Sequence, residues 1–513
     1  MAFCRLEVRS IENGRKKKEV FPKTAKEMLR IIKAADKKGE LLAAMETEFF
    51  QSVSMPALWA CREYIHKLPE EVYHQNTRKS MSMVAIRALL ATMENDLEGA
   101  KAYVSILGST PRHIQAENFT EKDYFRIITE LVMPYISDNQ FLHIACFVRK
   151  MGVPPIQSLT LSASRPSIIN GFRDFTRYGK YMMQYREDIT ETIRALYGDS
   201  SKGVFEIALA EWYYQNNDSF HALLLVTGTI PMMENMQDMQ CLFVAMALQM
   251  KILLLNGQMQ AAEPLVEKIR ERIKRTGWEE LTSSLNALGA WAACYDGKQE
   301  IVEEWLYTNA PDENKELYMM DMYAYLVKIR CYLLIGKYML ALILAKQLIH
   351  ILEKGQRFMD LCECYMLSAF ACCKAGSMDD MCDELEKAVG IAKKYNYIRL
   401  LADEGAYMVR MLVAYQKKRG ADTFTDEILI LAGEVGKRLP NYMKSPDEYY
   451  EPLTATEKKI LQFMAQGLSY QEIAEKTDKK IGTVKFHSSG IFKKLQVRNR
   501  QQAVNRAGEI GLL

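Results

Sequence analysis

The chain has 513 residues, of which 49% are hydrophobic and 26% charged, and its formal net charge is +3. This length exceeds what one hydrophobic core supports, so we expect two or more domains. No apolar run approaches the roughly 18 residues of a membrane-spanning helix, and the basic start lacks the apolar segment of a secretory signal. The sequence therefore predicts a cytoplasmic protein without membrane segments.

Residues 1–45 carry little structural signal, and their basic run at 15–18 is expected to be a solvated patch. Amphipathic helical patterns dominate the next segment, 46–415. Within it a signature recurs, in which Gly or Asn is followed five positions later by a small or apolar residue. Its clear copies begin at Asn95, Asn217, Gly257, Gly297, Gly336 and Gly376. From Asn217 onward the intervals are 40, 40, 39 and 40 residues.

This period predicts stacked helix hairpins. Gly or Asn can take the left-handed conformation that ends one helix, and the small residue lets the next helix pack closely. A hairpin cannot bury its own apolar face, so the units must stack into an all-α, TPR-like array with its ligand surface on the inner wall. Weaker copies at Asn139 and Gly179 would extend the array toward its start. The alternative is an irregular helical domain.

The sequence does not indicate an enzyme. We find no metalloprotease, hydrolase or P-loop motif, and predict no catalytic residue, no metal site and no cofactor. Asp403 and Glu404 are adjacent and point about 100° apart on a helix, so surface or capping roles are expected. The eleven cysteines are expected to be reduced core residues. A metal or redox cluster among those at 362, 364, 372 and 373 is the alternative.

After the repeats, residues 416–452 are predicted to hold a terminal helix (426–439) and a proline-containing linker (440–452). The composition then changes. Residues 452–513 carry eleven basic and five acidic side chains, a net charge of +6, whereas residues 1–451 carry −3. A basic terminal module on a slightly acidic body indicates a polyanionic partner for the module alone.

Residues 453–513 contain four short helical patterns with their own capping signals. The capping pairs are Thr454 with Glu457, Ser469 with Glu472, and Asn499 with Gln502. Two short helices joined by a brief turn, the second rich in lysine, match a helix-turn-helix.

The second of these helices, 481–495, has two chemically different sides. Its predicted inward stripe is Val484, Ser488, Ile491 and Leu495. The opposite side carries Lys485, Ser489 and Lys493, with Phe486 beside them and Thr483, His487 and Lys494 along a flank. An exposed Phe is costly in water but useful against a thymine methyl group, and the flank suits phosphate contacts. We therefore expect this side to enter a DNA major groove.

These residues resemble the LuxR/GerE-type DNA-binding domain in order and spacing. The matching positions are Leu453-Thr454, Glu457, Ala465-Gln466-Gly467-Leu468-Ser469, Glu472-Ile473-Ala474, Thr483-Val484-Lys485, His487, Ile491, Lys494-Leu495, Val497, Arg500 and Ala503-Val504. The resemblance implies base contacts from Lys485, Phe486 and Ser489. It implies DNA-backbone contacts from Thr483, His487 and Lys494, to which we add Lys493. It also implies a dimer surface on 499–509, for which we predict Ala503, Val504 and Ala507.

Several positions depart from that family pattern. Thr456, Thr477, Gly490 and Gln501 replace a usual Arg, Leu, Asn and Thr. Lys479 and Lys480 stand where the turn usually has an apolar residue and a capping Ser. Because a lysine side chain cannot accept a backbone N–H, helix 481–495 is expected to lack its usual cap, unless Asp478 substitutes one turn earlier.

The body resembles the repeat region of MalT-like large LuxR regulators, on residues 62–73, the forty-residue units and residues 395–405. Such regulators usually carry an ATPase module, but every Gly-Lys pair here lacks the following Ser or Thr of a P-loop, so no nucleotide switch is implied. The sequence predicts a transcription regulator that binds double-stranded DNA, as a homodimer, with a protein, peptide or small-molecule effector on its repeats. The alternative is a helical-repeat scaffold without specific DNA binding.

Overall fold

The computed structural model describes residues 23–51, 54–75, 77–108, 120–131, 133–134, 137, 144, 165–234, 239–443, 453–495 and 497–509. The predicted basic patch at 15–18, the weak repeat copy at Asn139 and most of the linker at 440–452 lie outside these residues. Over the described ranges the chain is helical, with one isolated bridge between Asn170 and Asp174 and no strand. None of the described helices combines the length and apolar character needed to cross a membrane.

The chain forms two compact units, Met1–Tyr442 and Met443–Leu513. The predicted limits at residues 45 and 415 fall inside helices α3 (Leu41–Gln51) and α22 (Gly405–Arg419).

The first unit begins with a group of helices that share one core. They are α2 (Ala25–Lys38), α3, α4 (Met55–Ala60), α5 (Arg62–Ile65), α6 (Arg78–Met93), α7 (Leu97–Ile106) and α8 (Glu121–Glu130). Met28 and Ile32 of α2 are fully buried in the same core as Leu58 and Val84. Residues 25–38 are therefore part of the packed body.

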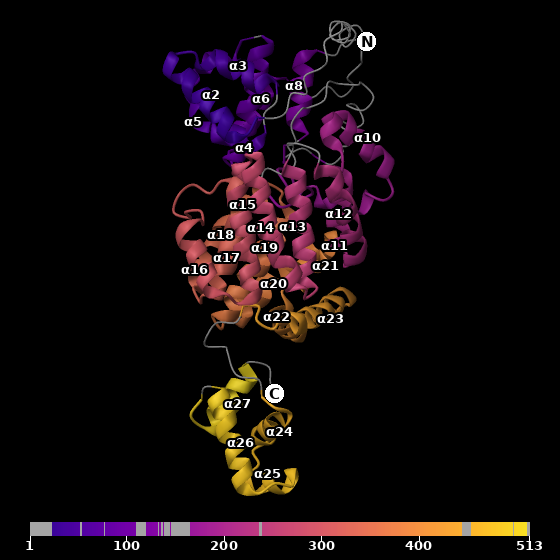
Figure 1. The fold of residues 1–513 in the computed structure, drawn as a ribbon, viewed down its shortest axis with the longest axis vertical. Coiled ribbons are helices and arrows are strands. Elements are labelled where there is room, and N and C mark those ends of the chain that lie inside the picture. Colours follow the sequence, from indigo (N-terminus) through magenta and orange to yellow (C-terminus); the bar gives the residue numbers. More distant parts are fainter. Residues whose placement is uncertain are drawn as a thin grey trace. The chain divides into compact units, whose positions relative to one another are not determined.

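Five helix hairpins follow one another along the rest of this unit (Figure 1). Their first helices, here called A helices, are α11 (Val204–Gln215), α13 (Met239–Leu255), α15 (Thr282–Asp296), α17 (Met322–Leu334) and α19 (Phe358–Lys374). Their second helices, here called B helices, are α12 (Ser219–Glu234), α14 (Met259–Thr276), α16 (Gln299–Thr308), α18 (Tyr338–Lys354) and α20 (Met378–Tyr395). The short helices α10 (Arg186–Tyr197) and α21 (Ile398–Ala402) precede and follow these hairpins, and α22 and α23 (Thr423–Arg438) end the unit.

The hairpin turns confirm the predicted signature. Each of the six clear copies begins with a residue at positive φ, between 62° at Asn95 and 84° at Gly376. The residue five positions later is buried in every copy, namely Ala100, Ala222, Ala262, Val302, Ala341 and Met381. Residues with small or flexible side chains at these positions allow the two helices of a hairpin to pack closely.

The prediction of a further repeat copy at Gly179 is wrong. It lies within a 3-10 helix, Thr176–Tyr181, and does not begin a hairpin. A Cβ atom at this glycine would lie 2.1 Å from Cδ1 of Trp212. The glycine is required because the backbone passes against the indole ring, and the local pattern of residues does not reveal that contact.

The inner wall, where we expected the ligand, is partly covered by the segment 165–176. Arg165 donates two hydrogen bonds to Asp360 on α19, at 2.6 and 2.9 Å, and the Asn170 side chain donates a third at 2.7 Å. Glu211 on α11 accepts from the Ser167 hydroxyl and from the Ile168 amide at 2.7 Å. A cavity of about 130 Å³ is left between this segment and the A helices.

Asp403 and Glu404 are buried, which corrects the surface or capping roles expected for them. Arg330 donates to Glu404 at 2.7 Å, and the hydroxyl of Tyr442 donates to the same carboxylate. Asp403 accepts from Tyr214 at 2.6 Å and pairs with Arg399. Burial of charge is tolerated here because each carboxylate faces a cation.

The nine described cysteines are buried and none of them forms a disulfide with another, in agreement with their predicted role as reduced core residues.

The second unit contains α24 (Ala455–Ala465), α25 (Tyr470–Thr477), α26 (Ile481–Lys494) and α27 (Arg500–Glu509). Its core is Leu453, Ile460, Leu461, Met464, Ile473, Ala474, Val484, Ile491, Leu495, Ala503 and Ala507. Helix α26 packs against both α24 and α25. The second unit therefore has its own hydrophobic core.

Candidate nucleic-acid interface

Capping interactions fix the starts of α24 and α25 as predicted. Thr454 accepts from the Glu457 amide, and the Glu457 carboxylate accepts from the Thr454 amide at 2.7 Å. Ser469 and Glu472 form the same reciprocal pair. These hydrogen bonds lower the pKa of Glu472 below its ordinary value, first through the backbone amide of Ser469. The reciprocal caps set where the two helices that support α26 begin.

The inward stripe of α26 is confirmed. Val484 and Ile491 are fully buried, and Ser488 and Leu495 nearly so. The Ser488 hydroxyl donates to the Val484 carbonyl at 2.7 Å, so its polar group is satisfied inside the core. This stripe fixes the rotation of α26 about its axis, and thereby which side chains reach the solvent.

The three predicted base-facing residues are exposed together on α26. Lys485 and Ser489 are exposed, and Phe486 has 76% of its surface accessible. The rings of Phe486 and His487 meet edge to face, with centroids 5.9 Å apart. An exposed aromatic ring of this kind is able to contact the methyl group of a thymine in a major groove.

The four predicted backbone contacts fall into two classes. Thr483 and Lys493 are exposed, and His487 is half-buried. Lys494 instead donates to Glu457 of α24 at 2.7 Å, with its side chain 19% exposed. Its ammonium group joins two helices of the unit, which argues against the predicted role as a simple phosphate contact.

The start of α26 has no side-chain cap, as its sequence predicts. Lys480 occupies the N-cap position without a capping hydrogen bond. Asp478 adopts a left-handed conformation and ends α25, so it does not replace the missing cap. The Thr483 amide donates to the Lys480 carbonyl at 2.9 Å, so the amides of Ile481 and Gly482 are left for water or for an anion such as a phosphate.

The predicted dimer surface on α27 needs correction. Ala503 and Ala507 are fully buried in the core of the unit, and Val504 is half-buried against it. Their spacing of four residues marks the helix face that packs inward. The exposed side carries Gln501 and Asn505, whose side chains share a hydrogen bond of 3.1 Å. Gln501 and Asn505 therefore lie on the solvent-facing side of α27, whereas the two alanines do not.

Two structural residues of this unit were not identified from the sequence as tertiary contacts. Glu457 was predicted only as a cap, yet it also pairs with Lys494 across the unit. Arg500 donates to the Met464 carbonyl at 2.7 Å and so ties α27 to the end of α24. Each contact joins residues about 36 positions apart, and no local periodicity records such a pairing.

Comparisons with known proteins agree with this geometry. Residues 200–418 match the MalT-like TPR region, and residues 451–507 match the bacterial regulatory proteins of the luxR family. The chain is 41% identical over 95 residues to the response regulator protein VraR of Staphylococcus aureus, in strains COL and MW2. That stretch is 18% of this chain and 42% of each relative, so the chain spans less than half of the relatives it matches. The chain is thus similar to the luxR family of bacterial regulatory proteins over residues 451–507 and to the MalT-like TPR region over residues 200–418.

Proposed function

We propose that the chain is a transcription regulator whose second unit binds promoter DNA through α26. The observation that carries the proposal is the two-sided burial of this helix. Val484 and Ile491 anchor it in the core, whereas Lys485 and Phe486 face the solvent. This is the arrangement that places a recognition helix in a major groove.

The charge of the second unit supports the same function. The net +6 of residues 452–513 contrasts with −3 for the rest of the chain. Cationic side chains that neutralise phosphates release counterions, and this release makes the affinity for DNA fall steeply with salt. Thr483, His487 and Lys493 are proposed to contact the DNA backbone, and Lys485, Phe486 and Ser489 the base edges.

Dimerisation on DNA is a further part of the proposal. Helix-turn-helix proteins often bind two half-sites as symmetric dimers. The exposed side of α27, with Gln501 and Asn505, is the proposed contact between two copies. The repeat array would respond to an effector and favour or oppose this pairing. The relatives' name, response regulator, is consistent with such control.

A salt titration tests the proposal. The full chain is mixed with a fluorescent duplex selected from a random pool, and its affinity is measured by anisotropy between 50 and 200 mM salt (roughly the range over which phosphate contacts lose strength). A linear fall of log affinity with log salt supports duplex binding through phosphate contacts. Absence of duplex binding at low salt contradicts it and favours the scaffold alternative.

Substitution of Lys485 then tests the geometry. If Lys485 reads a base, Lys485→Ala should cost about 1–3 kcal/mol on the selected site and relax specificity at one position. Lys268→Ala is the matched control, because Lys268 is an exposed lysine of α14 in the other unit. An equal loss of affinity on duplexes of all sequences would indicate that Lys485 contacts a phosphate group and not a base.

A further inference from the structure

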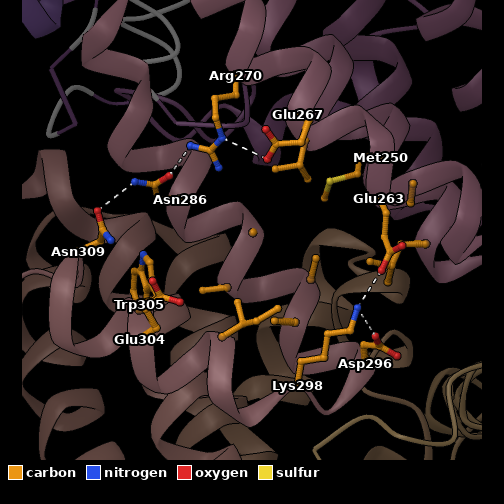
Figure 2. Close-up of a pocket in the computed structure, with 18 of the residues that line it drawn as sticks. Met250, Glu263, Glu267, Arg270, Asn286, Asp296, Lys298, Glu304, Trp305 and Asn309 are labelled. Carbon is orange, nitrogen blue, oxygen red and sulfur yellow. Dashed lines mark hydrogen bonds and ion pairs between the residues drawn. The ribbon is translucent and has the colours of Figure 1, made fainter.

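The B helices α14 and α16 enclose a groove whose floor is the A helix α15 (Figure 2). Its volume is about 360 Å³, larger than the cavity on the inner wall. The apolar part of its lining is Met250, Leu254, Met259, Ala262, Val266 and Ile301. Pockets of this size and character are typical of small-molecule sites.

A buried hydrogen-bond donor lines the groove without a partner. Trp305 on α16 is 5% exposed, and its ring nitrogen donates to no acceptor among the described residues. Figure 2 shows the ring of Trp305 beside Asn309 and Asn286, which line the same end of the groove. A buried N–H without an acceptor is unfavourable, so the site is incomplete until something supplies one.

The floor is kept open by a glycine. Gly289 stands in the middle of α15, where an alanine would favour the helix by about 1 kcal/mol. Its φ is not in the left-handed region, and a Cβ atom there would meet no atom within 4 Å. Neither backbone conformation nor close packing requires this glycine. It leaves space that a ligand can fill.

The charges at the rim decide which ligands fit. Arg270 is held by Glu267 at 3.2 Å and by Asn286 at 3.0 Å. At the other end Lys298 lies 2.8 Å from both Glu263 and Asp296. Both cations of the rim are thus occupied. Glu304, also at the rim, is exposed and forms no ion pair among the described residues. The rim therefore repels anions.

We propose that this groove binds a small, mostly apolar molecule without negative charge, which presents a hydrogen-bond acceptor to Trp305 Nε1. The role of this molecule as an effector rests on the proposed function, whereas its binding does not. The groove lies between B helices, and so differs from the inner wall expected from the repeat pattern.

Nile red is a suitable probe, because it is uncharged, apolar and carries a carbonyl acceptor. Titration of the full chain should give saturable binding at one site. Trp305→Phe keeps an aromatic ring but removes the donor, and should weaken binding by about fivefold. Gly289→Leu should fill the groove and weaken binding by at least about tenfold.

Gly390→Leu is the matched control, because Gly390 also lies within a helix with nothing within 4 Å of its Cβ position. It should leave the affinity for Nile red unchanged. An anionic probe, anilinonaphthalene sulfonate, should not bind in this groove. Gly289→Leu should therefore leave any binding of that probe unchanged. The proposal is overturned if Nile red binds Trp305→Phe as tightly as the unchanged chain, or if it does not saturate. Duplex binding is measured on the same samples. If the chain binds the duplex but Nile red does not bind as expected, the ligand proposal fails while the DNA-binding proposal stands.

Discussion

Lys494 of α26 lies 2.7 Å from the carboxylate of Glu457, at the start of α24. The same carboxylate accepts from the backbone amide of Thr454. One acidic side chain thus caps α24 and also holds the C-terminal end of α26. This double role joins the start of α24 to the end of α26, two helices that pack against each other.

The two adjacent lysines of α26 should therefore respond differently to substitution. Lys493 is exposed, so Lys493→Ala should reduce the salt slope of duplex binding by about 1 without changing the melting temperature. Lys494→Ala should instead lower the stability of the second unit by about 1–3 kcal/mol, because the carboxylate of Glu457 loses one of its hydrogen-bonding partners. Calorimetry and anisotropy on both variants check this. If the two variants have the same melting temperature and lose the same salt slope, Lys494 contacts the DNA backbone as Lys493 does.

Acid should loosen the second unit through Glu457. Burial alone would raise the pKa of Glu457, but hydrogen bonds from Lys494 and Thr454 hold it below its ordinary value. Its contribution to stability is therefore present above pH 4.5 and is lost as the pH falls through the lowered pKa. Amide exchange in α24, corrected for intrinsic rates, should speed up over this range. Glu457→Gln should show fast exchange already at pH 7, and an unchanged pH response in that variant would count against the assignment.

Phe486 should recognise thymine through its methyl group. Because 76% of Phe486 is exposed, Phe486→Ala should leave folding unchanged. On a duplex with thymine at the contacted position, it should cost about 1–2 kcal/mol of binding free energy, from lost apolar burial. A duplex with uracil at that position provides the matched control, since it differs by the methyl group alone. On uracil the unchanged chain and Phe486→Ala should bind alike. A persistent difference would show that the ring contacts something else.

The first unit should lose stability as the pH rises toward neutrality, through Glu211. Burial, opposed by hydrogen bonds from Ser167 and the neighbouring amides, raises the pKa of Glu211 from 4.5 to about 7. The folded form therefore binds the proton more tightly. The stabilisation is full below pH 4.5 and is lost as the pH rises through about 7, a change of about 3 kcal/mol at most.

Melting temperatures between pH 5 and 8 test this. Glu211→Gln imitates the protonated carboxyl and should flatten the profile. Glu187→Gln, which changes an exposed carboxylate on α10, should keep the slope of the unchanged chain. If Glu211→Gln also keeps that slope, another group is responsible.

The local parts of the fold were predictable, and the long-range contacts were not. The left-handed turns at Asn217 and Gly257 follow from residue type, and the inward stripe of α26 follows from helical periodicity. In contrast, the burial of Glu404 depends on Arg330 and Tyr442, which lie 74 and 38 residues away. The family resemblance led us to predict Ala503 on a dimer surface, but it did not reveal that the core of the same unit covers this residue. Which surface covers an apolar face is decided by tertiary packing, and one sequence does not contain that information.

Two glycines of α23, one turn apart, should respond to alanine with opposite signs. At Gly436 a Cβ atom would lie 2.8 Å from the backbone nitrogen of Ala406 on α22. Because backbone cannot move aside as a flexible side chain can, Gly436→Ala should force the two helices apart and cost about 1–3 kcal/mol.

At Gly433 nothing lies within 4 Å of the Cβ position. Gly433→Ala should therefore stabilise α23 by about 0.5–1 kcal/mol, because alanine loses less backbone entropy on folding. Both substitutions add the same methyl group to the same helix, so the difference between their melting temperatures isolates the contact with α22. If both variants are stabilised, α22 and α23 do not approach each other at this glycine, and the end of the array is packed differently.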